Sequence, residues 1–130
     1  MPGRYLLDTN AVIDLFAPNE ELLARLEAAE AVFLSTIVLG ELNFGAEKSH
    51  RVAENHARIE SFAAECTVLA PDVAVARDYG RVKKSLKSRG RPIPENDVWI
   101  AATALIHGLT VLSRDHHLDF VDGLERETWR

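Results

Sequence analysis

The sequence has a single cysteine and no long hydrophobic run. One cysteine, Cys66, excludes a disulfide scaffold and a zinc cluster built on paired cysteines. The longest apolar segment runs from Val98 to Ile106, interrupted by Thr103, and falls well short of the roughly 20 residues that a membrane span requires. The apolar stretch before Asp8 is too short for a secretory signal. We therefore expect a soluble, reduced, cytoplasmic protein with no membrane partner.

Proline and glycine are also scarce, with five and seven residues, which excludes collagen-like and disordered chains. The 130 residues are 47% hydrophobic and 27% charged. A chain of this length buries roughly two-thirds of its unfolded surface, which is enough for a core without covalent staples. We therefore expect one globular domain over residues 1–130.

Basic residues are outnumbered, and the formal net charge of −5 argues at first against a nucleic-acid partner. Their distribution changes this view, because residues 77–91 hold seven of the fifteen basic residues and only one acid. Such a run is often an ordinary solvated helix face. Alternatively, it is a strip that follows RNA phosphates. The candidate RNA contacts in this strip are Arg81, Lys83, Lys84 and Lys87.

Short apolar segments alternate with longer amphipathic ones along the chain. Segments 4–8, 31–34, 67–70 and 109–112 are typical of buried strands, and 123–129 is a candidate edge strand. Thr9 or Asn10 is the expected cap of the helix after the first strand, and Asn96–Asp97 is expected to open a buried helix. This alternation predicts an α/β fold with a short, mainly parallel sheet of four to five strands and helices on both faces.

Four acidic residues fall where this layout brings them together. Asp8 ends the first strand, Glu41 lies in the helix after the second strand, Asp97 begins the buried helix, and Asp115 follows the fourth strand. Each also has a purely structural explanation, as a turn residue, a helix cap or an exposed helix residue. Taken together they point to function, because ligands of such sheets bind outside the carboxyl ends of the strands.

Converging carboxylates repel one another unless a cation neutralises them. Oxygen ligands without paired cysteines or well-spaced histidines favour Mg²⁺, with Mn²⁺ as a substitute, over zinc. The adjacent His116 and His117 are expected to point apart and not to chelate one ion, although either could contact substrate. The pattern therefore predicts a metal-dependent phosphodiester hydrolase.

Four blocks of sequence stand out in this order: Tyr5–Asn10, Leu34–Leu42, Pro94–Ala104, and Leu112–Asp115 with Asp119 and Phe120. Together they resemble the PIN-domain ribonucleases, and among them most closely the VapC toxins of prokaryotic toxin–antitoxin pairs. The resemblance implies a three-layer α/β/α sandwich, a Mg²⁺ site and cleavage of RNA, with tRNA or rRNA as substrate. It also implies a homodimer, a VapB-type antitoxin that inserts a peptide into the acidic site, and a larger toxin–antitoxin assembly.

In this resemblance Asp8, Glu41, Asp97 and Asp115 match the acidic quartet of the family. Asp8, Asp97 and Asp115 are then the expected metal ligands, and Glu41 is expected to orient or deprotonate the attacking water. Three residues are expected to support the site: Asn10, Ser113, which stands where the family commonly has threonine, and Asp119, which matches a more variable fifth acid.

Two alternatives remain open at this point. A non-catalytic RNA-binding module of the same fold would keep the architecture without the reaction. A phospho-accepting receiver-like domain would need an acceptor aspartate at the end of a central strand and a lysine after a late strand. Here Ala70 and Pro71 follow the third strand and Arg114 follows the fourth, which argues against the receiver.

Overall fold

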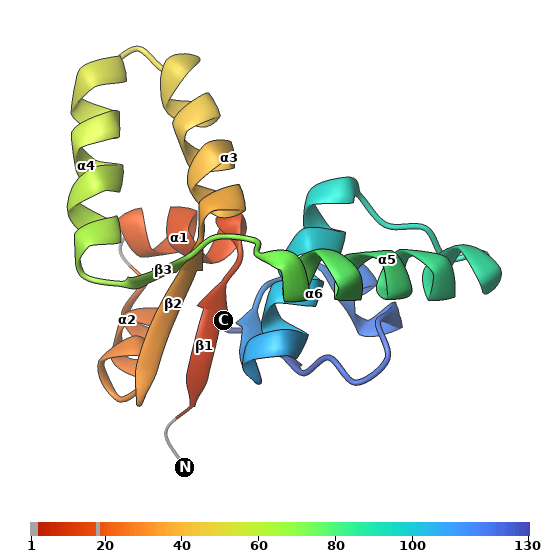
Figure 1. Cartoon of the computed structure of the whole chain (residues 1–130). Coiled ribbons are helices and arrows are strands. Elements are labelled where there is room, and N and C mark those ends of the chain that lie inside the picture. The colour runs from red at the N-terminus through yellow and green to blue at the C-terminus, as the bar shows by residue number, and fades with distance from the viewer. Residues whose placement is uncertain (1–2, 18) are drawn as a thin grey trace.

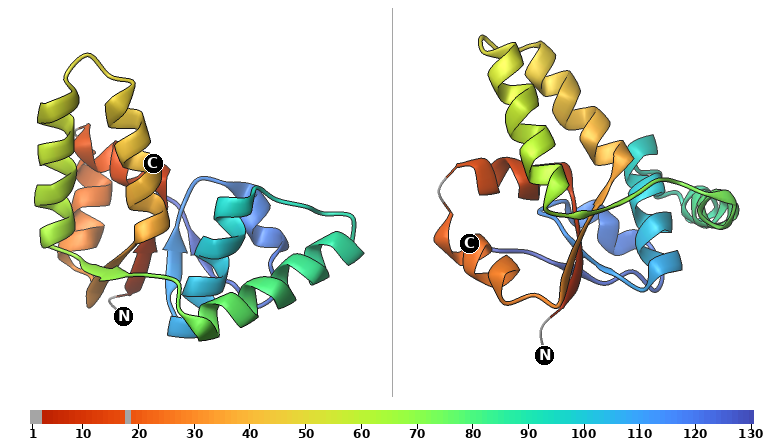
Figure 2. Two further views of the ribbon diagram at one scale, coloured as in Figure 1. Left: turned by 45° about the horizontal axis from the view of Figure 1, so that its top comes forward. Right: turned by 60° about the vertical axis from the view of Figure 1, so that its left-hand side comes forward.

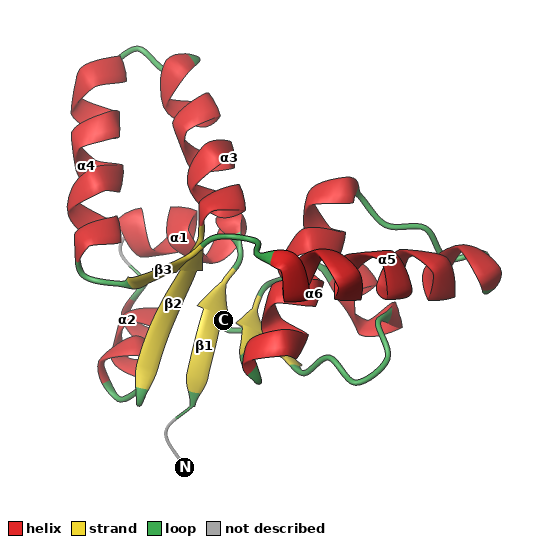
Figure 3. Ribbon diagram, viewed as in Figure 1, coloured by secondary structure: helices red, strands yellow, loops and turns green. Residues whose placement is uncertain are grey.

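A computed structural model describes residues 3–17 and 19–130 and contains a five-stranded sheet with helices packed on both of its faces (Figures 1 and 3). Every strand pairs in parallel with its neighbours, in the order β3-β2-β1-β4-β5. The strands are β1 (Arg4–Leu7), β2 (Ala31–Ser35), β3 (Thr67–Leu69), β4 (Thr110–Leu112) and β5 (Arg126–Glu127).

The helices follow the strands in the alternation that the sequence predicts. Their bounds are α1 (Thr9–Phe16), α2 (Glu20–Glu27), α3 (Thr36–Glu47), α4 (Val52–Ala64), α5 (Val73–Ser88) and α6 (Glu95–His107), with a 3₁₀ turn η1 (His116–Phe120) after β4. Viewed along the sheet, α1 and α2 lie on one side and α5 and α6 on the other (Figure 2). Helices α3 and α4 form an antiparallel pair that rises beyond the carboxyl ends of the strands (Figure 1). The predicted α/β/α architecture is confirmed.

The central strand is covered from both faces, and this explains its unbroken apolar sequence. Tyr5, Leu6 and Leu7 are all buried, as expected for a parallel strand between two helical layers. A second, smaller cluster packs α5 against α6 and includes Val82, Leu86, Val98, Ala101 and Val121. On its other side α6 contributes Ile100 and Ala104 to the main core, which also contains the buried residues of β1 and β4. Helix α6 is therefore packed between α5 and the sheet.

Two helix starts differ from the sequence predictions. Helix α1 is capped by Asp8 itself, not by Thr9 or Asn10, because the extended Asp8 backbone lets its carboxylate accept from the Thr9 amide at 2.9 Å. Helix α6 begins at Glu95, after Pro94, and not at Asn96–Asp97. Proline is favourable at this boundary because it has no amide hydrogen that would need a partner. Asp97 therefore lies within the first turn of α6.

The edge strand in 123–129 is confirmed as β5, a two-residue strand that pairs with β4. Gly108 ends α6 in the left-handed conformation (φ 65°), where glycine costs least, and turns the chain into β4. Within residues 3–17 and 19–130, no helix is both long and apolar enough to span a bilayer.

Candidate active site

Asp8 is the best-anchored acid of the site. Its amide continues the ladder of the sheet by donating to the Leu112 carbonyl at 3.0 Å. One carboxylate oxygen caps α1, and the other accepts from the Ser113 hydroxyl at 2.6 Å. The side chain is 2% exposed. The junction of β1 and α1 thus holds a buried carboxylate at the carboxyl edge of the sheet.

Ser113 and Asn10 connect Asp8 to the loop that carries Asp115. The Ser113 hydroxyl accepts from the Asp115 amide at 3.0 Å, and the Asn10 side-chain amide donates to Ser113 and Asp8 at 3.3 and 3.4 Å. The side-chain carbonyl oxygen of Asn10 accepts from the backbone amide of Arg114 at 3.2 Å. These contacts fit the supporting role predicted for Asn10 and Ser113.

Asp97 lies on the first turn of α6, which packs on the face of the sheet opposite to α1 (Figure 2). It is 8% exposed, and one of its carboxylate oxygens lies 2.5 Å from Nε2 of His117. The same nitrogen lies 3.9 Å from a carboxylate oxygen of Asp115. One ligand atom from each of these three residues lies within 4.8 Å of the other two.

Glu41 reaches the site from α3. Its carboxylate accepts from the Thr9 hydroxyl at 3.0 Å, which ties the second residue of the β1–α1 junction to the third helix. Glu41 and Asp8 are outside the group formed by Asp97, Asp115 and His117. Glu41 is nevertheless held at the same site by a defined contact.

All four predicted acids line one open cavity of about 490 Å³ at the carboxyl edge of the sheet. The wall contributed by β1 and α1 includes Asp8, Thr9 and Asn10, and the opposite wall belongs to the start of α6. The lining residues are Asp8, Thr9, Asn10, Ile13, Glu41, Pro94, Glu95, Asn96, Asp97, Asp115 and His117. The convergence that the sequence predicts is therefore present in the fold.

Burial and mutual repulsion make two of these carboxylates costly to ionise. Desolvation raises the pKa of Asp8, an effect that the hydrogen bond from Ser113 opposes and that the nearby Asp115 charge adds to. Desolvation likewise raises the pKa of Asp97, against the hydrogen bond from His117. When these two carboxylates are ionised, their surroundings supply little positive charge to stabilise them. A cation would supply it.

The donor set suits a hard divalent ion. Asp8, Asp97 and Asp115 offer carboxylate oxygens, and the half-exposed His117 adds one nitrogen. Mg²⁺ and Mn²⁺ accept such oxygen ligands and keep waters for the remaining positions. The residues present therefore fit the metal that the resemblance implies.

Asp119, predicted as a supporting residue, is directed elsewhere. Its two carboxylate oxygens accept from the Arg126 guanidinium at 2.8 and 2.9 Å, and it is absent from the lining of the acidic cavity. The pairing with Arg126 lowers the pKa of Asp119. Of the two candidate acids after β4, the structure brings Asp115 and not Asp119 to the site.

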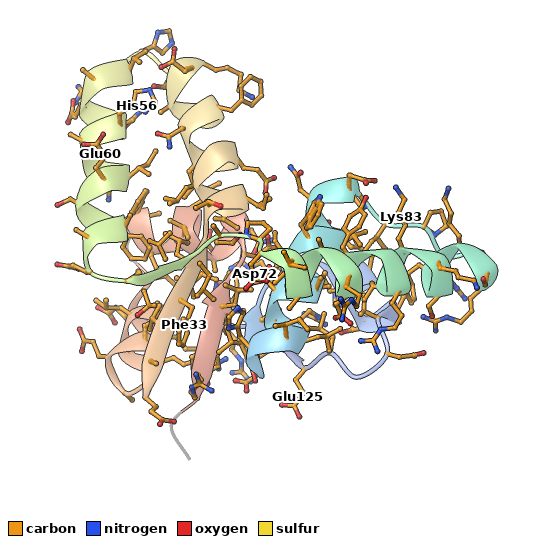
Figure 4. The ribbon with its side chains drawn as sticks, viewed as in Figure 1. Phe33, His56, Glu60, Asp72, Lys83 and Glu125 are labelled. Atoms are coloured by element: carbon orange, nitrogen blue, oxygen red, sulfur yellow. The ribbon has the colours of Figure 1, made fainter. Side chains whose placement is uncertain are left out.

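Most of the predicted basic strip lies along α5, which projects beside α6, and one of its lysines contacts a residue that lines the cavity (Figures 1 and 4). The Lys83 ammonium contacts both carboxylate oxygens of Glu95 at 2.9 Å, and Glu95 lines the acidic cavity. Arg81 is paired with the buried Asp78. Lys84 and Lys87 are exposed.

Two residues of the site are not found by sequence reasoning. The pattern indicates Thr9 only as a helix cap, although a hydroxyl directly after the first acid is well placed to orient a second one. His117 is not expected as a ligand, because adjacent histidines point apart. They do so here, since His116 Nδ1 lies 3.3 Å from the Arg126 guanidinium, but His117 alone joins the acids.

Comparison with known proteins places these observations in a family. The PIN-domain model matches residues 5–124. The chain is 36% identical over 129 residues to "Ribonuclease VapC2" of Haemophilus influenzae, and equally to "tRNA(fMet)-specific endonuclease VapC" of Shigella flexneri. In both cases the alignment covers 97% of this chain and 98% of the relative.

Solved structures agree with the sequence comparison. The crystal structure of DNA-bound VapBC from Salmonella typhimurium contains a chain that superposes with a TM-score of 0.91 at 29% identity, and each chain is covered over its full length. The receiver-like alternative is thereby removed. From its acidic cavity, its parallel sheet and these relatives, the chain belongs to the PIN-domain family and, within it, to the VapC ribonucleases.

Proposed function

We infer that this chain is a divalent-metal-dependent endoribonuclease and the toxin of a VapB–VapC pair, which acts in the cytoplasm and inhibits translation by cutting tRNA or rRNA. The observation that supports this most is the convergence of Asp8, Asp97 and Asp115 from three separate elements on one open cavity that Glu41 also lines. The name of the Shigella flexneri relative favours tRNA as the substrate class.

In this proposal Asp8, Asp97 and Asp115 hold Mg²⁺ or Mn²⁺, directly or through water. A divalent ion bound there would lower the pKa of the attacking water and stabilise charge on the phosphate oxygens. Glu41, oriented by the Thr9 hydroxyl, accepts the proton of that water. Asn10 and Ser113 hold Asp8 and the Asp115 loop in register. Water as the nucleophile leaves 5′-phosphate and 3′-hydroxyl ends.

The test is cleavage of purified tRNA and total RNA with and without EDTA. We expect cleavage in Mg²⁺, its loss in EDTA and its return when Mg²⁺ or Mn²⁺ is added in excess, with 5′-phosphate ends at every cut. Cleavage that resists EDTA, or products with cyclic phosphates, would overturn the mechanism. Binding of RNA without cleavage in either buffer would favour the non-catalytic alternative.

The basic strip is proposed to guide RNA to the acidic cavity, which by itself repels phosphates. Replacing Lys83 and Lys84 together by alanine should weaken RNA binding and lower the slope of log K against log salt by about one unit for each lysine–phosphate pair removed. Fluorescence anisotropy with a labelled tRNA over a salt series measures this slope. Arg51→Ala, in the turn between α3 and α4, is the control and should leave it unchanged. An unchanged slope in the double variant would remove the strip from the mechanism.

The partner proposed for the cavity is a basic side chain of a VapB-type antitoxin, because a positive group there would neutralise the buried carboxylates. A homodimer, and a larger assembly with the antitoxin, are proposed on the resemblance to the VapC toxins alone.

A further inference from the structure

His117 is the one nitrogen donor among the described residues that joins the acidic cluster. The chain reaches this position through η1, which follows β4 directly and turns the two adjacent histidines in different directions. His117 Nε2 faces Asp97 and Asp115, whereas His116 faces Arg126. One histidine is thus placed among the expected ligands, and its neighbour is not.

The distances suit a ligand that shares an ion with both acids. Two ligand atoms on one ion with bonds of about 2.1 Å can be at most about 4.2 Å apart. Nε2 of His117 lies 3.9 Å from Asp115 and 2.5 Å from Asp97, so both separations fall within this limit. The separation between Nε2 and the Asp97 oxygen would increase slightly when an ion binds between them. His117 is only half-buried, which leaves its ring room for that adjustment.

We propose that His117 is a direct ligand of the catalytic metal and that it shifts the preference of the site from Mg²⁺ towards Mn²⁺. The proposal rests on the metal site of the proposed function and adds a nitrogen ligand to its oxygen set. Mg²⁺ binds oxygen almost exclusively, whereas affinity for nitrogen donors increases along the first-row divalent metals from Mn²⁺ onward. Mn²⁺ binds most weakly in that series, so a preference for Mn²⁺ over Mg²⁺ is a stricter test of a nitrogen ligand than a preference for a later metal would be.

The competing role is that His117 only donates a hydrogen bond to Asp97 and holds it in place. Such partners also affect metal affinity, so a lower affinity alone would not separate the two roles. His117→Gln does, because the glutamine amide nitrogen can donate to Asp97 in place of Nε2 but cannot bind a metal. If the amide oxygen turned to the ion instead, it would add an oxygen ligand and would restore neither the nitrogen signal nor a preference for metals that favour nitrogen. His116→Gln is the matched control one residue away.

The experiment measures Mn²⁺ and Mg²⁺ affinities of the full chain by calorimetry, and the nitrogen coupling of bound Mn²⁺ by pulsed electron paramagnetic resonance. We expect the wild type to bind Mn²⁺ more tightly than Mg²⁺ and to show an imidazole ¹⁴N signal. In His117→Gln this signal should vanish and the Mn²⁺ affinity should fall about tenfold or more, with a much smaller change for Mg²⁺. His116→Gln should match the wild type in all three measurements.

The possible failures point to different conclusions. If Mn²⁺ binds without an imidazole signal, or if His117→Gln keeps the wild-type ratio of the two affinities, His117 is not a ligand and only this inference is overturned. If neither metal binds the wild type, the metal site itself is wrong, and the proposed function fails with it.

Discussion

Replacement of Asp8 by asparagine is expected to reduce RNA cleavage by about 100-fold or more. Loss of a residue that merely supports a metal ligand commonly costs 10–100-fold, so loss of a ligand charge should cost at least the upper end of that range. The substitution keeps the shape of the side chain, and the amide oxygen can still cap α1 by accepting from the Thr9 amide. Initial rates on a labelled tRNA substrate measure the effect.

Asp119→Asn is the matched control, because Asp119 is also an acid of the last sequence block but is paired with Arg126 outside the cavity. Its cleavage rate should stay within about threefold of the wild type, the small effect expected of a surface substitution. Normal cleavage by Asp8→Asn, or equal losses in both variants, would show that the proposed ligand set is wrong.

Asp97→Asn is expected to lose cleavage as well, yet to be more stable than the wild type in metal-free buffer at neutral pH. Ionised Asp97 is buried close to Asp8 and Asp115, and desolvation raises its pKa. Asparagine removes this repulsion and can still accept from His117. A gain on the order of 1 kcal/mol, the usual size of the effect of a single substitution, is expected. Thermal unfolding in EDTA should show it as a rise of about 3–6 °C in Tm.

The gain should depend on pH in a defined direction. A carboxyl with a raised pKa in the folded state stabilises the protein fully below its unfolded pKa, near 4, and this contribution is lost as pH rises through the folded value. The advantage of Asp97→Asn over the wild type should therefore be largest near pH 7 and decline towards pH 4. Taking the difference between the two proteins cancels the opposite trend of Asp119, whose pKa is lowered. An advantage that grew on acidification would contradict the assignment.

The parts of this fold that could be predicted from sequence are those set by local patterns. The apolar run Tyr5–Leu7 followed by Asp8 indicates a strand that ends in a carboxylate, and parallel pairing then brings Asp8 and Asp115 to the same edge. The position of Asp97 at the start of a buried helix follows from the apolar residues after it. Each of these patterns can be recognised in a short stretch of sequence, and the alternation of strands and helices then places the stretches relative to one another.

The parts that could not be predicted depend on contacts between distant segments. Asp119 and Arg126 are both ordinary surface residues in sequence, and it is the short strand β5 that brings the guanidinium of Arg126 to Asp119. The direction of the His117 side chain depends on the 3₁₀ turn η1. This turn is only five residues long, which is too short to produce a hydrophobic periodicity that could be recognised in the sequence. Lys83 is twelve residues from Glu95, and the packing of α5 on α6 sets their pairing.

The central claim is that these carboxylates share a divalent ion, and thermal unfolding of the wild type and Asp97→Asn with and without Mn²⁺ tests it most directly. An ion that binds only the folded protein stabilises it by about 2.7 kcal/mol at one hundred times its dissociation constant. We expect Mn²⁺ to raise the Tm of the wild type by several degrees and to leave Asp97→Asn almost unchanged, so that the metal-free order of stability is reversed. Equal stabilisation of both proteins, or of neither, would contradict the account.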